Sequence, residues 1–73
     1  MEKQFKNKDG NIKVTQEEYS ITVDPQDKKE IIKVDRNQSK ESILKETEDK
    51  LNVVYEGSPA FVKEFIKWLE DVV

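Results

Sequence analysis

The side chains of this sequence that could do chemistry are carboxylates, lysines and hydroxyls, because the chain contains no His and no Cys. Histidine is the usual proton carrier at neutral pH, and His and Cys are the usual zinc ligands. Two pairs of acids remain as candidate ligands for a hard cation: Asp24 with Asp27, and Glu48 with Asp49. Neither pair has the alternating oxygen ligands and late bidentate glutamate of an EF-hand loop. We therefore expect no metal and no cofactor, and we interpret these acids as solvated surface residues.

Catalysis by a serine nucleophile is also disfavoured. Such a serine needs a neighbouring base, and the sequence offers none of the usual ones. The segment Gly57-Ser58-Pro59 precedes a helical pattern, and a helix N-terminus can hold an anion. A phosphate-binding loop carries more glycines and usually a lysine at the helix start, and this segment has neither. We expect Ser58 to cap the helix with its side-chain oxygen. Because the usual nucleophile–base arrangements are missing, we expect that the protein is not an enzyme.

Basic residues between positions 28 and 40 could contact a nucleic acid. They are Lys28, Lys29, Lys33, Arg36 and Lys40. On an antiparallel sheet, beside Tyr19 or Tyr55 as a stacking ring, such a patch could bind phosphates and bases. Neighbouring acids would cancel much of its field. These acids are Asp24, Asp27, Glu30, Asp35 and Glu41. Nucleic-acid binding is therefore the alternative function and not the leading one.

The chain as a whole carries thirteen Lys and Arg against sixteen Asp and Glu, which gives a formal net charge of −3. This balance lacks both the strongly basic surface of a nucleic-acid-binding protein and the strongly acidic surface of a DNA mimic. No apolar run approaches the roughly 18 residues that span a bilayer, and the N-terminus has no signal-peptide pattern. We expect a soluble, cytoplasmic protein.

A chain of 73 residues has room for one domain with one core. Domains of this size bury only about 60% of the surface that the unfolded chain exposes, so their stability is small. Disulfides and metals stabilise many such domains, but this sequence lacks the residues for both. We expect a protein partner or a second copy of the chain to contribute instead. We expect residues 1–3 to be loose.

A hairpin is predicted near the N-terminus. Asp9-Gly10 is a strong signal for a two-residue type I′ turn, because both central residues of that turn need positive φ. The flanking segments are residues 5–8 and 11–15. In the second of them, Ile12 and Val14 alternate with polar residues, which puts the apolar side chains on one face.

Two further strands are predicted from alternation. Apolar residues repeat with period two over residues 19–23, and Pro25 ends this strand because it cannot donate a hydrogen bond to a neighbour. Residues 30–35 form the next strand, with Ile31 on the face opposite the core. The first half of the chain therefore predicts an antiparallel meander.

Residues 39–51 allow two interpretations. Ser39 is a candidate N-cap, and apolar residues at helical spacing together with i,i+4 Glu-Lys pairs favour a short helix. The rival is a second hairpin with strands at residues 42–47 and 51–56. Under either interpretation, we expect Val53-Val54-Tyr55 to form a strand.

The clearest helical pattern is C-terminal, over residues 58–72. Its apolar stripe has two rows: Phe61, Phe65, Trp68 and Val72, and Val62, Ile66, Leu69 and Val73. A small sheet of short strands has few inward aliphatics to cover so wide a stripe, so part of it should remain for a partner. The candidate protein interface is the distal part of the helix: Trp68, Leu69, Val72 and Val73.

These elements define an α+β domain over residues 1–73. It consists of an antiparallel meander of four or five strands packed against the C-terminal helix, with one additional short helix if residues 39–51 are helical. Because fold alone does not determine function, the function is inferred from the candidate surfaces. We expect a non-enzymatic protein-binding module, such as a small regulator, an accessory subunit or an inhibitor encoded by a mobile element.

Overall fold

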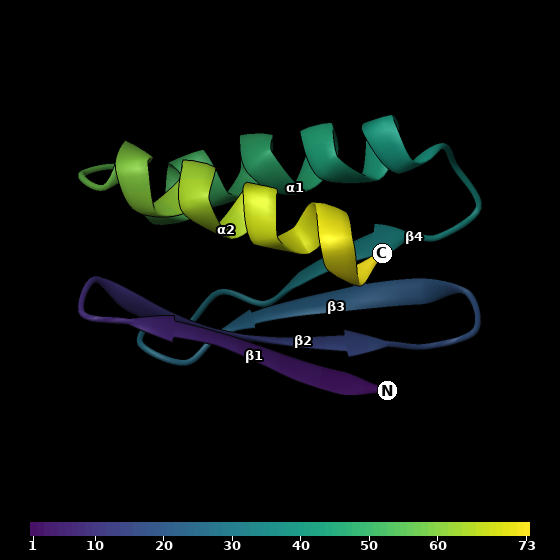
Figure 1. The fold of residues 1–73 in the computed structure, drawn as a ribbon, viewed down its shortest axis with the longest axis horizontal. Coiled ribbons are helices and arrows are strands. Elements are labelled where there is room, and N and C mark those ends of the chain that lie inside the picture. Colours follow the sequence, from purple (N-terminus) through teal and green to yellow (C-terminus); the bar gives the residue numbers. More distant parts are fainter.

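The computed structural model of residues 1–73 is a four-stranded antiparallel sheet with two helices on one face (Figure 1). The strands are β1 (Glu2–Asn7), β2 (Gly10–Gln16), β3 (Ser20–Pro25) and β4 (Ile32–Asp35), in the order β1-β2-β3-β4. The helices α1 (Lys40–Val54) and α2 (Pro59–Val72) follow. The α+β class, the antiparallel meander and the packing of the C-terminal helix against the sheet are confirmed.

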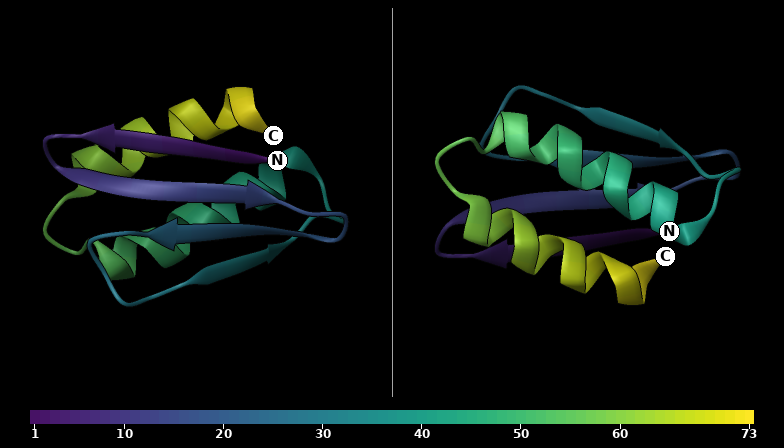
Figure 2. Two further views of the ribbon diagram at one scale, coloured as in Figure 1. Left: turned by 90° about the horizontal axis from the view of Figure 1, so that it is seen from below. Right: turned by 90° about the horizontal axis from the view of Figure 1, so that it is seen from above.

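The two helices lie side by side in one layer, and the other face of the sheet carries no helix (Figure 2). Side chains of β2, β3 and β4 that point toward the helices are buried: Ile12, Val14, Ile21, Val23, Ile32 and Val34. Cross-strand neighbours on the other face are polar, as in the pair Thr15 and Thr22. The period-two alternation read from the sequence therefore separates the core from an open polar face.

The hairpin between β1 and β2 differs from the predicted one. Asn7 pairs with Gly10, so the loop consists of Lys8 and Asp9, and no residue of the chain has positive φ. The Asn7 side-chain oxygen accepts hydrogen bonds from the backbone N–H groups of Asp9 (2.8 Å) and Gly10 (3.2 Å). This asparagine turn closes the hairpin without left-handed residues, so the type I′ prediction is wrong. The strand begins at Glu2, where the sequence suggested a loose segment.

Residues 40–54 form a helix, which decides between the two interpretations of this segment. Ser39 caps the helix as predicted, because its side-chain oxygen accepts a hydrogen bond from the backbone N–H of Ser42 at 3.1 Å. Thr47 is fully buried on the core side of α1, and its hydroxyl donates to the Ile43 carbonyl at 2.8 Å. The buried hydroxyl is thereby satisfied within the helix.

The strand predicted at Val53-Val54-Tyr55 is wrong. Val53 and Val54 form the end of α1, and Tyr55 is its C-cap. The Tyr55 side chain is only 4% exposed, and its ring centre lies 4.9 Å from that of Phe61 in α2. Burial of this ring at the joint between the helices outweighs the strand propensity of two valines, which is a small energy.

The helix α2 begins at Pro59, with Ser58 as its N-cap, but the Ser58 side chain makes no capping hydrogen bond. The predicted side-chain cap is therefore wrong, and the helix starts with a proline that has no N–H to satisfy. At the other end of α2, the Gln16 side-chain amide donates to the Val72 carbonyl at 3.0 Å, which ties the helix to β2. The buried residues of α2 are Phe61, Val62, Phe65 and Leu69.

Candidate functional site

A groove lies between the end of α1, the first part of β4 and the loop that precedes β4. The right view of Figure 2 shows the end of α1 approaching this loop. The groove has a volume of about 670 Å³. The residues that line it are Lys28, Lys29, Glu30, Ile31, Ile32, Lys33, Lys50, Val53 and Val54. It therefore sits at the outer edge of the sheet, where a partner can reach it.

Aliphatic side chains are exposed on both walls of the groove. Ile31 is 65% exposed on the strand side, and Val53 is 75% exposed on the helix side. Only two other large hydrophobic residues of the chain are comparably exposed, Met1 and Tyr19. Single exposed hydrophobic residues are ordinary on protein surfaces, whereas clustered ones mark interaction sites. Ile31 and Val53 are exposed on the same groove, which makes this surface a candidate interaction site.

Lysines surround these aliphatics. The basic residues of the groove are Lys28, Lys29, Lys33 and Lys50, and its one acid is Glu30. Lys50 is ion-paired with Glu46 at 2.9 Å, while the other three lysines form no ion pair. The groove is therefore positive on a chain whose net charge is −3.

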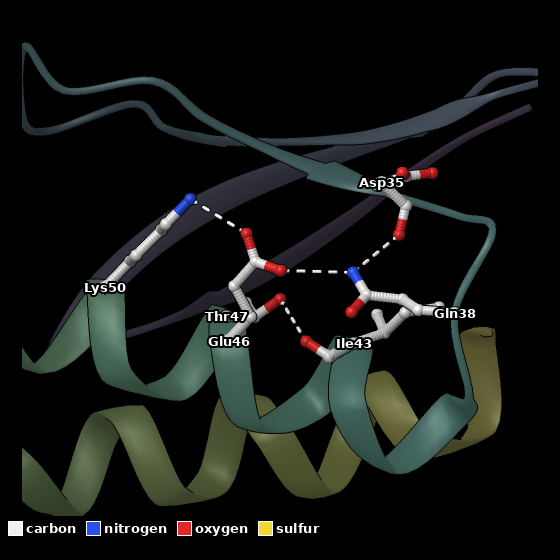
Figure 3. Close-up of polar contacts among 6 residues, drawn as sticks. All are labelled: Asp35, Gln38, Ile43, Glu46, Thr47 and Lys50. Carbon is white, nitrogen blue, oxygen red and sulfur yellow. Dashed lines mark hydrogen bonds and ion pairs between the residues drawn. The ribbon is translucent and has the colours of Figure 1, made fainter.

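Hydrogen bonds hold α1 against the end of β4 (Figure 3). The Gln38 side-chain amide donates to the Asp35 carbonyl at 2.7 Å and to the Glu46 carboxylate at 3.0 Å. The other oxygen of Glu46 accepts a hydrogen bond from Lys50 at 2.9 Å. The hydrogen bonds that Glu46 accepts from Lys50 and Gln38 lower its pKa, and the bond from Lys50 has the larger effect. Gln38 thereby links the end of β4 to α1, and Glu46 holds the Lys50 ammonium in place.

The loop between β3 and β4 is anchored to the end of α1. The Tyr55 hydroxyl donates to the Asp27 carboxylate at 2.7 Å, and the Lys28 ammonium lies 5.3 Å from the centre of the Tyr55 ring. Burial raises the pKa of Tyr55 above its ordinary value, and the hydrogen bond to Asp27 adds to this shift. The hydroxyl therefore stays protonated at neutral pH, and the anchored loop presents Lys28 at the groove.

Part of the β4 backbone is free to pair with another strand. The Arg36 N–H donates to the Tyr19 carbonyl at 3.1 Å. In an antiparallel pair, every second residue of a strand forms hydrogen bonds to the same neighbouring strand. Counting back from Arg36, Val34 and Ile32 therefore bond to β3, whereas the N–H and C=O of Lys33 point away from β3. The open edge of the sheet therefore has unpaired hydrogen-bonding groups beside the groove.

The distal end of α2, where the interface was predicted, and the end of α1, which lines the groove, lie at opposite ends of the molecule (Figure 1). Leu69 is fully buried, which places it in the core and out of reach of a partner. Trp68, Val72 and Val73 are half-buried and pack against the core. The Trp68 ring centre lies 5.4 Å from that of Phe5, so β1 covers part of the stripe that the sequence left open. The helix-end interface stays a prediction that now depends on the three half-buried residues.

The structure brings together only part of the basic set predicted to contact nucleic acid. Lys28, Lys29 and Lys33 line the groove. Arg36 and Lys40 instead lie beside a separate hollow near the C-terminus. Nucleic-acid binding therefore stays a prediction with a smaller set of cations on one surface.

Six of the nine residues that line the groove were not predicted as site residues: Glu30, Ile31, Ile32, Lys50, Val53 and Val54. Val53 was assigned to a strand, although the helical spacing of Ile43, Thr47 and Leu51 puts it on the opposite side of α1. An aliphatic residue on the polar side of an amphipathic helix is a signal that could have identified it. Lys50 was interpreted only as an i,i+4 partner within its helix, and no local pattern shows that α1 lies over β4.

No group of three or more acidic side chains is gathered where it could hold a metal ion. Asp27, one of the acids considered above, instead accepts the hydrogen bond from Tyr55. Neither helix is long and apolar enough to cross a membrane.

Among known proteins, no protein-family model, no curated protein and no solved structure matches the chain. The function must therefore be inferred from the groove and its residues.

Proposed function

We propose that the protein is a non-enzymatic protein-binding module that docks a partner in the groove between β4 and α1. The observation that carries the proposal is the exposure of Ile31 and Val53 on one groove with four lysines, three of which form no ion pair. Protein interfaces have this anatomy, with apolar contacts at the centre and polar residues at the rim. A small regulator, accessory subunit or inhibitor would act in this way, and the proposal includes a cytoplasmic setting.

The residue types at the groove support binding over catalysis. General acid–base catalysis works best with a group whose pKa lies near the operating pH. The pKa of Tyr55 is shifted upward, away from neutrality, and its hydroxyl is committed to Asp27. The other side chains at the groove are lysines, aliphatics and one glutamate, a set better suited to recognising a surface than to turning over a substrate.

Site-specific photo-crosslinking tests this function. A photoreactive amino acid that replaces Ile31 should capture a partner in a concentrated extract of the source cells. The same amino acid at Tyr19 is the matched control, because the two native side chains are equally exposed, at 65% and 67%. Excess unlabelled protein should compete for the capture, and its Val53→Glu variant should not. Failure to capture a partner from position 31, or equal capture from both positions, would count against the proposal.

Nucleic-acid binding is the second candidate function, and the gathering of Lys28, Lys29 and Lys33 at one surface favours it. Titration of labelled single-stranded RNA and DNA at several salt concentrations distinguishes it from protein binding. Phosphate contacts make the affinity fall steeply with salt. A flat titration at low salt would remove this candidate.

A further inference from the structure

The open edge of β4 and the groove beside it point to one kind of occupant. We propose that the partner presents an extended acidic segment, which pairs with β4 as an additional strand. This inference rests on the protein-binding function proposed above. Strand addition gives affinity through backbone hydrogen bonds and specificity through the side chains at alternate positions.

The backbone of β4 is available where the groove lies. The N–H and C=O of Lys33 point away from β3, as the alternation of the ladder requires. Farther along the strand, the Asp35 carbonyl already accepts the Gln38 amide at 2.7 Å. Pairing is therefore limited to the first part of β4, and an added strand would be centred on Lys33 and extend past Ile31.

The opposite edge of the sheet does not offer such a surface. Along β1, the residues whose side chains face away from the core are Glu2, Gln4 and Lys6. Glu2 is also paired with Lys13 at 3.7 Å. The only large hydrophobic residue exposed next to β1 is Met1, whereas Ile31 and Val53 are both exposed beside β4. The groove edge is therefore the preferred one.

The aliphatic residues of the groove determine what the added strand must carry. Side chains of a strand alternate between its two faces. One set would lie against Val53 and Val54 at the end of α1, and the other would lie beside Ile31. We therefore expect aliphatic residues at alternate positions of the docked segment.

The charge of the groove selects acidic residues for the remaining positions. Lys28, Lys29 and Lys33 are free of ion pairs, whereas the chain as a whole is negative. An acidic segment is attracted to this edge and repelled by much of the remaining surface, which favours both encounter and register at the groove.

Two other occupants fit these observations less well. A second copy of the chain would pair β4 with β4 about a two-fold axis, which brings Lys33 close to its counterpart, and like charges on facing strands are destabilising. A nucleic acid would need an exposed ring for its bases. The Tyr55 ring is buried, and Tyr19 is exposed but does not line the groove.

Selection from a displayed library of random peptides of about eight residues, a typical strand length, tests the proposal without knowledge of the partner. Peptides that the wild-type protein retains should be acidic and should carry aliphatic residues at alternate positions. Enrichment of basic or patternless sequences, or of none, would overturn the proposal.

A synthetic peptide of alternating glutamate and valine is the defined probe. Its Kd should rise at least about tenfold for Lys33→Glu and for Val53→Glu, because each change removes one component of the groove. Lys63→Glu is the matched control, since Lys63 is an exposed residue of α2 outside the groove, and it should leave the Kd almost unchanged. Circular dichroism of every variant confirms that it is folded.

N-methylation of alternate peptide amides tests strand pairing itself, because it removes backbone donors and leaves the side chains in place. Alternate amides of a strand point to opposite sides. Methylation of the set that faces β4 should abolish binding, and methylation of the set that faces away should be tolerated. Tolerance of methylation in both sets would show that the peptide does not bind as a strand. In the wild-type protein, the Lys33 amide should become protected from hydrogen exchange when the peptide is added.

Further outcomes separate this inference from the function on which it rests. Capture of a partner from position 31 without binding of acidic peptides would end strand addition and leave the protein-binding function standing. Failure of both would end both. Single-stranded DNA whose binding is lost in Lys33→Glu, or a wild-type dimer that Val53→Glu converts to a monomer, would assign the groove to those occupants and overturn the proposal.

Discussion

The ring of Phe61 packs directly on Gly10 at the start of β2. A Cβ atom on Gly10 would lie 2.5 Å from the Phe61 Cζ atom, closer than van der Waals contact allows. The ring is held in place by other rings, with centres 5.7 Å away in Phe5 and 4.9 Å away in Tyr55. Gly10 is therefore needed for its missing side chain and not for an unusual φ, and the aromatic ring covers the gap that a strand glycine leaves.

Gly10→Ala should destabilise the protein by about 1–3 kcal/mol, because the methyl group overpacks the site under Phe61. Urea unfolding followed by circular dichroism measures the effect. Gly57→Ala is the matched control, since no atom lies within 4 Å of its Cβ position and its φ is not positive. That variant should be neutral or up to about 1 kcal/mol more stable. Equal unfolding midpoints for the two variants would disprove the tight contact.

The two helix caps should respond differently to removal of their hydroxyls. Ser39→Ala should lower stability by about 1 kcal/mol, because the Ser39 oxygen accepts the Ser42 N–H at 3.1 Å. Ser58→Ala should change stability by only a few tenths of a kcal/mol, since the Ser58 side chain makes no capping bond. Thermal unfolding of both variants checks this order, and the reverse order would mean that α2 depends on its serine after all.

Tyr55 should make the protein less stable at alkaline pH. Folding raises its pKa above the ordinary value of 10.0, so the folded state favours the protonated hydroxyl. The contribution is therefore complete below about pH 10 and is lost as the pH rises toward the folded pKa. Tyr55→Phe should flatten this alkaline slope and lower stability near pH 7 by about 1 kcal/mol, because the hydrogen bond to Asp27 disappears. Urea unfolding between pH 7 and about 11 measures both effects, with Tyr19→Phe as the control.

Trp68→Ala tests whether the end of α2 belongs to the core or to an interface. The Trp68 ring centre lies 5.4 Å from that of Phe5 and 5.5 Å from that of Phe65. Loss of these contacts by a half-buried ring should lower the free energy of unfolding by about 2 kcal/mol. Analytical ultracentrifugation of the same variant completes the test. An unchanged unfolding midpoint together with self-association weakened by about 2 kcal/mol would assign Trp68 to an interface.

Local patterns were sufficient to predict the four strands of the sheet and one helix cap. Val14, Ile21 and Val23 alternate with polar neighbours, and in a sheet with one covered face that alternation directly sets which side chains are buried. The Ser39 cap is equally local, because its partner is three residues away. Such features depend only on neighbouring residues, so the sequence contains the whole of their cause.

Contacts between distant segments decided the features that the sequence did not reveal. Asp9-Gly10 satisfies the local rule for a left-handed turn, but Gly10 is required by a ring in α2. Val53 and Tyr55 have high strand propensity, but the burial of Tyr55 against Phe61 keeps them at the end of α1. The groove combines residues of β4 with residues of α1, so its composition could be known only once the packing of the two elements was known.

Phe5 belongs to the first strand, yet its ring contacts are all in the last helix: Phe61, Phe65 and Trp68. The hairpin of β1 with β2 can form early, because its pairing is local. The Phe5 ring on the apolar side of that hairpin has none of these three partners until α2 has been made. Synthesis proceeds from the N-terminus, so four strands and α1 leave the ribosome before the partner of Phe5 is available. The nascent chain should therefore be most prone to aggregation, and most dependent on chaperones, while α2 is still in the exit tunnel.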